Sequence, residues 1–114
     1  MNENIKVITI CGSMRFTEEM MKIAGELELK QGYAVIQCAY FLETDGSVGE
    51  LLDKIHLKKI DISDAIYVVN IDGYIGESTR NKIKYATELG KEIIYHEPTK
   101  KNVLNHCNIQ CGLI

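Results

Sequence analysis

Two short stretches of the sequence combine glycine, hydroxyl and charged residues in a pattern that suits anion binding. The first is "CGSMR", in which Arg15 offers a planar set of donors for a phosphate or carboxylate. The second is "IDGYIGEST", which precedes a predicted helix whose free N–H groups favour an anion. We therefore predict one small-molecule site formed from both stretches. Its predicted binding residues are Cys11, Gly12, Ser13, Arg15, Asp72, Gly73, Gly76, Ser78 and Thr79.

Each stretch also has a purely structural interpretation. "CGSMR" contains neither GxGxxG nor GxxxxGK[ST], so it equally fits a tight turn in which Gly12 allows close packing. Ser78 or Thr79 equally fits an N-cap, whose hydroxyl accepts a hydrogen bond from the first turn of the helix. The sequence leaves both interpretations open.

Lys82 is an unusual residue for the start of a helix, because that end carries partial positive charge and favours acids. Arg80 and Lys84 add further positive charge, and Glu77 is the nearest preceding acid. The sequence therefore raises the question of which negative group makes a lysine acceptable at position 82.

Several other residues carry weaker predictions. His56, in the middle of a predicted helix, fits a structural or exposed role better than a catalytic one. Asp61 and Asp64 flank the end of that helix, where turn and capping chemistry is the expected role. Tyr40 and Tyr74 lie in predicted loops, from which an aromatic ring can stack on a base.

Four short apolar runs predict the strands of a parallel sheet, because their hydrophobicity is nearly continuous, as in strands buried on both faces. The runs are Lys6–Cys11, Tyr33–Cys38, Ala65–Ile71 and Glu92–Glu97. Three helical patterns separate them, at Thr17–Gln31, Val48–Ser63 and Ser78–Leu89. The residues predicted to face inward are Met20, Ile23, Ala24 and Leu27 in the first helix, Leu51, Leu52, Ile55 and Ile62 in the second, and Ile83, Ala86 and Leu89 in the third.

This alternation predicts an α/β fold: a small doubly wound, Rossmann- or flavodoxin-like parallel sheet with right-handed connections. The expected strand order is 2-1-3-4. Ligands bind such sheets beyond the carboxyl ends of the strands, at the point where the order reverses. That point lies between the first and third strands, where both glycine-containing stretches meet. The long connection Ala39–Gly49 is predicted to act as a lid over the site.

Composition and charge narrow the class of protein. A net charge of −3 argues against a general nucleic-acid binder, and no run approaches the roughly 18 apolar residues of a membrane span. The start of the chain lacks the features of a signal peptide, so we expect a cytoplasmic protein with free thiols. We predict one domain at residues 1–98 and a tail at 99–114 that packs on this domain or on a neighbouring chain. The tail sequence "HCNIQC" lacks the usual zinc-ligand spacing, and we expect no metal and no cofactor.

Three longer stretches resemble the nucleoside 2-deoxyribosyltransferase superfamily, and more narrowly its small bacterial and phage branch. They are "ITICGSMRF", "KIHLKKIDISDAIYVVN" and "GYIGESTRNKIKYATELGKEIIYHEP", and the similarity spans residues 6–98 in order. The matching motifs of the branch are CGSTRF, HLRKIDLAD and GYIGESTRxEIxYAxxxGK. Only the third of these motifs is highly specific by itself.

The resemblance implies homodimers or higher homo-oligomers, and cleavage or exchange of the N-glycosidic bond of 2′-deoxynucleosides or their monophosphates. It also implies that a glutamate at the start of the third helix attacks C1′ and forms a glycosyl-enzyme intermediate. That glutamate falls on Lys82, whose positive charge cannot serve the same role. Glu77 is turned from it by about 140° around a helix. The residues expected to contact sugar and phosphate are Gly12, Ser13, Arg15, Ser78 and Thr79.

Three functions therefore stay open. The protein is an active enzyme that uses another acid, for which Glu77, Glu43 and Glu50 are candidates. Alternatively, it is a catalytically silent nucleotide-binding homologue in which Lys82 contacts an anion. In the third interpretation it is a homo-oligomeric interaction protein with a relict pocket. The first two predict a nucleoside or nucleotide as partner, with no nucleic acid and no membrane.

Overall fold

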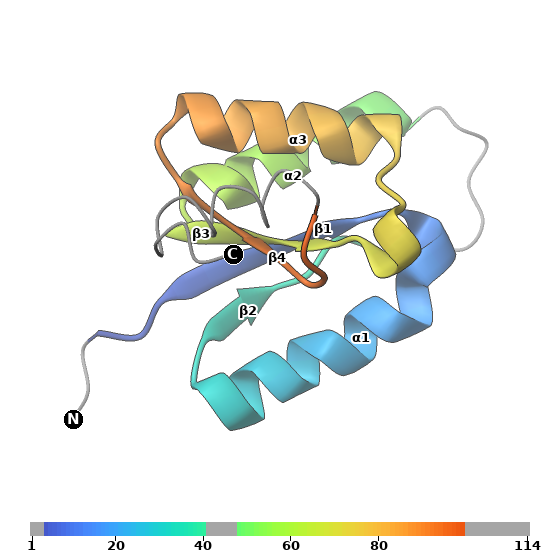
Figure 1. Cartoon of the computed structure of the whole chain (residues 1–114). Coiled ribbons are helices and arrows are strands. Elements are labelled where there is room, and N and C mark those ends of the chain that lie inside the picture. The colour runs from blue at the N-terminus through green and yellow to red at the C-terminus, as the bar shows by residue number, and fades with distance from the viewer. Residues whose placement is uncertain (1–3, 41–47, 100–114) are drawn as a thin grey trace, which may run out of the picture.

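One parallel sheet organises the chain, and helices cover both of its faces (Figure 1). The structure is a computed structural model that describes residues 4–40 and 48–99. The strands run in the order β2-β1-β3-β4, and every neighbouring pair is parallel. This confirms the predicted α/β fold and the predicted order 2-1-3-4. The strand bounds are Val7–Gly12 for β1, Ala34–Ile36 for β2, Ala65–Val69 for β3 and Glu92–Tyr95 for β4.

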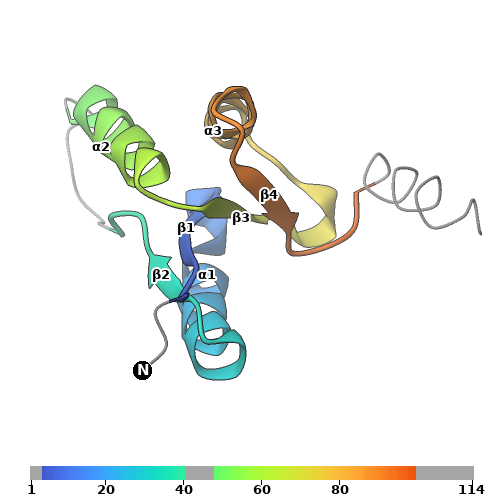
Figure 2. The same cartoon turned by 90° about the vertical axis from the view of Figure 1, so that its left-hand side faces the viewer.

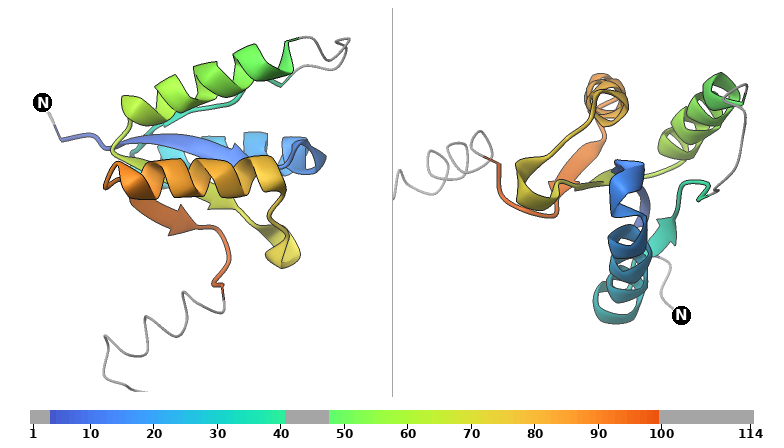
Figure 3. Two further views of the ribbon diagram at one scale, coloured as in Figure 1. Left: turned by 90° about the horizontal axis from the view of Figure 1, so that it is seen from above. Right: turned by 90° about the vertical axis from the view of Figure 1, so that its right-hand side faces the viewer.

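The helices form two layers. One helix lies against one face of the sheet, and the other two lie together on the opposite face (Figures 2 and 3). Short 3₁₀ turns at Met14–Phe16 and Ile71–Gly73 follow β1 and β3. The single helix is α1 (Thr17–Glu26), which continues as a π-helical turn at Leu27–Gln31, and the pair is α2 (Gly49–Asp61) and α3 (Glu77–Glu88).

The inward face predicted for α1 is confirmed. All four of its predicted inward residues are buried, and they pack with Ile10 of β1 and Val69 of β3 in one core cluster. Gly32 ends the element with a φ of 73°, a left-handed conformation that glycine adopts without a Cβ penalty. Apolar spacing was a sufficient guide here because every buried side chain of α1 is apolar.

The inward face predicted for α2 is wrong at three of its four residues, and only Leu52 is half-buried. Leu51, Ile55 and Ile62 are 55%, 42% and 63% exposed, whereas His56 and Ile60 are buried. The helix is turned so that His56 meets a polar partner on β1, and its Nε2 lies 3.0 Å from the Ile10 carbonyl oxygen. A buried polar group must find a partner, and an exposed leucine costs little. The hydrogen bond of His56 to β1 therefore decides which face of α2 points inward.

The start of α3 also differs from the prediction. The helix begins at Glu77 with Gly76 as its N-cap, and no side chain caps it. Ser78 and Thr79 are therefore not N-caps, and an acid does occupy the first turn, as the helix dipole favours. Of the residues predicted to point inward from α3, Ala86 is buried, Ile83 is half-buried and Leu89 is 47% exposed.

Gly12 is needed because two core side chains leave no room for a Cβ atom. A Cβ built there would lie 2.8 Å from the Met20 sulfur and 3.1 Å from the Val69 Cβ. We expect Gly12→Ala to lower the free energy of unfolding by about 1–3 kcal/mol, the usual cost of overpacking. Urea denaturation measures this loss.

Gly25→Ala is the matched control, because a Cβ at Gly25 meets nothing within 4 Å. Alanine favours a helix interior over glycine by about 1 kcal/mol, so this variant should be as stable as the parent or more so. Equal losses in the two variants would contradict a specific packing role for Gly12.

Several predictions fall outside the described residues. They concern the greater part of the predicted lid and all of the tail beyond Thr99, including its cysteines. Within residues 4–40 and 48–99, no helix combines the length and apolarity needed to cross a membrane. In the same two segments, His, Cys, Asp and Glu side chains nowhere gather in threes around a possible metal position.

Candidate functional site

A cavity of about 360 Å³ lies between α2, the start of α3 and the carboxyl end of β1. This is the predicted position, beside the switch point between β1 and β3. Its walls come from four parts of the chain. The lining residues are Gly12, Ser13 and Met14 after β1, Cys38 and Ala39 after β2, Gly49, Leu52, Asp53, Ile55, His56 and Lys59 of α2, and Gly76, Glu77, Ser78, Thr79 and Lys82 at the start of α3.

The two predicted glycine-containing stretches therefore do meet. Residues 12–14 of the first stretch line the cavity together with residues 76–79 of the second. Both predicted catalytic candidates, Glu77 and Lys82, line it as well. The fold brings them together because each stretch follows the carboxyl end of one of two adjacent parallel strands.

Four predicted binding residues lie outside the lining of this cavity. The Cys11 side chain is fully buried among Ile60, Ile66 and Ala86, so it belongs to the core. Burial raises the pKa of its thiol to about 12, despite the opposing effect of Lys82, so the thiol stays protonated. This outcome fits its alternative interpretation as a small buried hydrophobe.

Arg15 is the second predicted binding residue outside the lining. Its guanidinium carbon lies 3.8 Å from the centre of the Tyr74 ring, and Phe16 packs edge-on to the same ring. A guanidinium over an aromatic face is attracted by the ring quadrupole. This contact also occupies Tyr74, which was predicted to stack on a base.

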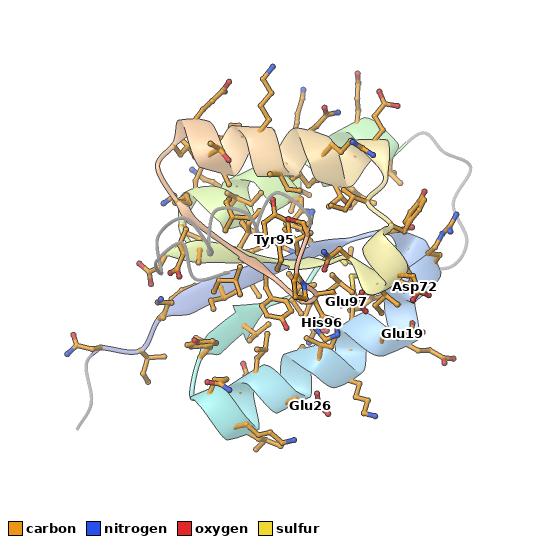
Figure 4. All side chains as sticks on the ribbon, viewed as in Figure 1. Glu19, Glu26, Asp72, Tyr95, His96 and Glu97 are labelled. Carbon is orange, nitrogen blue, oxygen red and sulfur yellow. The ribbon has the colours of Figure 1, made fainter. Side chains whose placement is uncertain are left out.

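Asp72 and Gly73 form a turn beyond the end of β3. Asp72 has a φ of 57°, and its backbone N–H donates to the Glu97 carboxylate at 3.0 Å. Figure 4 shows Asp72 and Glu97 close together beyond the ends of β3 and β4. Both glycine-containing stretches thus contribute to the cavity, but only through the residues nearest their helix starts.

Lys82 is held by two contacts that reach it from different helices. Its Nζ lies 3.0 Å from Oδ1 of Asp53 on α2 and 2.8 Å from Oγ of Ser78 on its own helix. The ammonium donates to both oxygens. Only 10% of the Lys82 side chain is exposed, against 63% of the Asp53 side chain. Asp53 is therefore the negative group that makes a lysine acceptable at position 82.

The sequence did not predict that Asp53 belongs to the site. It is separated from Lys82 by 29 residues and belongs to no recognised motif. Its one available signal is its spacing from His56, which places both residues on the same side of α2. Had the polar side of α2 been recognised as the inward side, Asp53 would have been a candidate. The cavity thus contains two carboxylates, those of Asp53 and Glu77, beside one buried ammonium.

His56 is a neutral, oriented imidazole in the wall of the cavity. Its Nε2 lies 3.0 Å from the Ile10 carbonyl oxygen, which can only accept, so Nε2 carries the proton and Nδ1 is an acceptor. Burial lowers the pKa of His56 to about 4, and the charges of Lys82 and Lys59 act in the same direction. The Ile10 carbonyl and Asp53 oppose this shift only partly. The imidazole therefore supplies no positive charge to the cavity at neutral pH.

Asp61 and Asp64 were predicted to have turn or capping roles, but both instead accept hydrogen bonds from distant parts of the chain. The Asp64 carboxylate accepts from the Val7 backbone N–H at 2.8 Å, which ties the turn after α2 to β1. The Asp61 carboxylate accepts from the Tyr85 hydroxyl and so joins α2 to α3. The second contact lies near the C-terminal ends of α2 and α3, away from the start of α3 that lines the cavity.

Comparison with known proteins does not assign the chain to a family. No protein-family model matches it, and no curated protein matches it. The resemblance to the deoxyribosyltransferase superfamily therefore stays a prediction that rests on the motifs of the sequence. What the chain does must be argued from the geometry of this cavity.

Proposed function

We propose that the cavity binds a 2′-deoxynucleoside or its 5′-monophosphate, with the N-glycosidic bond beside Asp53 and Lys82. The observation that carries this proposal is the meeting of the two glycine-containing stretches in one cavity of about 360 Å³. Cavities of roughly 300–1,000 Å³ accommodate small organic ligands. The sequence resemblance supplies the class of ligand, and the geometry supplies a place that suits it.

The start of α3 is the proposed position for a phosphate. No side chain caps this helix, so no capping group accepts a hydrogen bond from its first backbone N–H groups. Such groups, with the dipole of a helix of 12 residues, favour an anion. The Ser13 hydroxyl lies on the adjoining wall and adds a further donor. A monophosphate should therefore bind more tightly than the corresponding nucleoside.

The wall formed by α2 suits the less polar part of the ligand. Leu52 and Ile55 line the cavity there, and Met14 adds an apolar side chain after β1. Apolar walls with a few placed polar groups are typical of small-molecule sites. We expect the base to lie along this wall and the sugar to lie between it and the phosphate.

The alternative of a silent binder with Lys82 on the anion is less favoured by the contacts. The ammonium already donates to Asp53 and to Ser78 and is largely buried. An anion at that position would have to compete with the Asp53 carboxylate. The predicted homodimer or higher homo-oligomer stays a prediction, and so does the third alternative, an interaction protein with a relict pocket.

Leu52→Trp tests the proposed cavity, because an indole at this position would fill it. Calorimetry with the four common 2′-deoxynucleoside 5′-monophosphates should show at least about tenfold weaker binding, equal to about 1.4 kcal/mol. Leu51→Trp is the matched control, since Leu51 is 55% exposed and does not line the cavity. Equal effects of the two variants would contradict binding at this cavity. Absence of binding by the unaltered protein to all monophosphates and nucleosides would contradict the proposed function.

A further inference from the structure

The ion pair at the cavity suggests where the chemistry of this site lies. The glutamate that the resemblance implies is replaced by Lys82, but Lys82 brings the carboxylate of Asp53 to the same place. We infer that Asp53 is the catalytic carboxylate of this site and acts at C1′ of the bound deoxynucleotide. This inference rests on the proposed function and adds to it a reacting residue and a reaction.

The Asp53 carboxylate lies close to the place that a glutamate carboxylate at position 82 would occupy. A glutamate side chain is shorter than a lysine side chain, so its carboxylate at position 82 would end just short of the Lys82 Nζ. The Oδ1 atom of Asp53 lies 3.0 Å from that Nζ, within one hydrogen-bond length. The two arrangements thus offer a carboxylate to nearly the same region of the cavity, from α3 in one case and from α2 in the other.

Asp53 is also the more accessible member of the ion pair. The Asp53 side chain is 63% exposed and lines the cavity, whereas the Lys82 side chain is only 10% exposed. A ligand in the cavity therefore meets the carboxylate of the pair more readily than the ammonium. Glu77 also lines the cavity, but it occupies the first position of α3, about 140° around the helix from position 82. No described ammonium pairs with Glu77, so Asp53 is the better oriented acid.

Lys82 also holds the Asp53 carboxylate in place. Its ammonium, 3.0 Å away, donates a charge-assisted hydrogen bond that fixes the direction of this carboxylate. The Ser78 hydroxyl holds that ammonium from the other side at 2.8 Å. Lys82 is in this arrangement a positioning residue, which acts through Asp53 and not on the substrate. A lysine at the place of the expected glutamate is then compatible with glycosidic chemistry.

The proposed reaction has two steps, as in retaining glycosidases. An Asp53 carboxylate oxygen forms a bond to C1′ while the C1′–N bond breaks, and the bonding electron pair leaves with the base. The base takes a proton from solvent. In the second step, water attacks C1′, the bond to the Asp53 oxygen breaks, and the water returns a proton to solvent. A second base in place of water would complete an exchange and not a hydrolysis.

Asp53→Asn tests the inference in the full chain, because the amide keeps an oxygen that accepts from Lys82 and loses the charge. Base release from the four 2′-deoxynucleoside 5′-monophosphates is followed by chromatography. We expect the variant to lose at least about 100-fold in rate, the scale of a positioned reactive group, and to keep monophosphate binding by calorimetry. Glu88→Gln is the matched control, since it removes one charge from an exposed position at the far end of α3 and should leave the rate unchanged.

A trapping experiment identifies the reacting atom directly. A 2′-fluoro-2′-deoxyarabinonucleotide slows the second step of such reactions, so a glycosyl adduct should accumulate and map by peptide mass spectrometry to Asp53. An adduct on another residue, or an Asp53→Asn variant with the parent rate, would overturn the inference. So would a parent protein that binds monophosphates and releases no base, although the proposed function would then stand. A parent protein that neither binds nor releases would overturn both.

Discussion

Lys82→Glu is expected to lower the free energy of unfolding by about 2–3 kcal/mol, although it restores the acid that the resemblance implies at this position. The new carboxylate would lie beside Asp53, whose Oδ1 is 3.0 Å from the present ammonium. Two carboxylates at that separation repel, and the one from position 82 would be largely buried. Exposure of Asp53 to solvent keeps the expected loss below that of a fully buried pair.

A double-mutant cycle separates this effect from a general disturbance of α3. Urea denaturation of the parent, Lys82→Glu, Asp53→Lys and the double variant gives the coupling between the two positions. We expect the double variant to recover about 1 kcal/mol or more of the loss, because it restores opposite charges in exchanged places. Losses that simply add would show that positions 53 and 82 do not interact.

Lowering the pH from 6.5 to 4 is expected to cost the folded protein up to about 3 kcal/mol through His56 alone. The pKa of its imidazole falls from the usual 6.5 to about 4 on folding. Burial disfavours the charged ring, and the positive charges of Lys82 and Lys59 repel it. Below pH 6.5, His56 therefore binds a proton in the unfolded chain, whereas in the folded protein it becomes protonated only near pH 4. Each pH unit of that gap corresponds to about 1.4 kcal/mol. Above pH 6.5 both states are neutral, so His56 contributes no pH dependence there.

His56→Gln isolates this contribution, because the Gln side-chain N–H can donate to the Ile10 carbonyl as Nε2 does, and an amide does not titrate in this range. Thermal or urea unfolding between pH 4 and pH 7 should show a shallower decline for the variant than for the parent. Carboxylates elsewhere titrate in both proteins, so the difference between the curves reports His56. Parallel curves would mean that the imidazole is not held neutral by the fold.

The secondary structure was predictable wherever one physical requirement dominated. The four strands are almost continuously apolar because both faces of the sheet are covered, and the α1 face follows from apolar spacing. The α2 face was not predictable in this way. Leu51 and Ile62 can be exposed at little cost, whereas buried His56 must have a partner, and that partner is a backbone carbonyl of β1.

The amino-acid sequence was enough to predict the parallel α/β sheet, its strand order, and the meeting of the stretches around Gly12 and Gly76 at one end of the sheet. These follow from local hydrophobicity and from the handedness of connections, which are the same in any chain with this alternation. The sequence was not enough to predict how Lys82 is neutralised, because its partner Asp53 lies on another helix, 29 residues away. The rotation of α2, set by the bond between His56 and β1, is what aims that carboxylate at the cavity. The sequence shows that Lys82 needs a negative partner, but the packing of α2 against the sheet decides that this partner is Asp53.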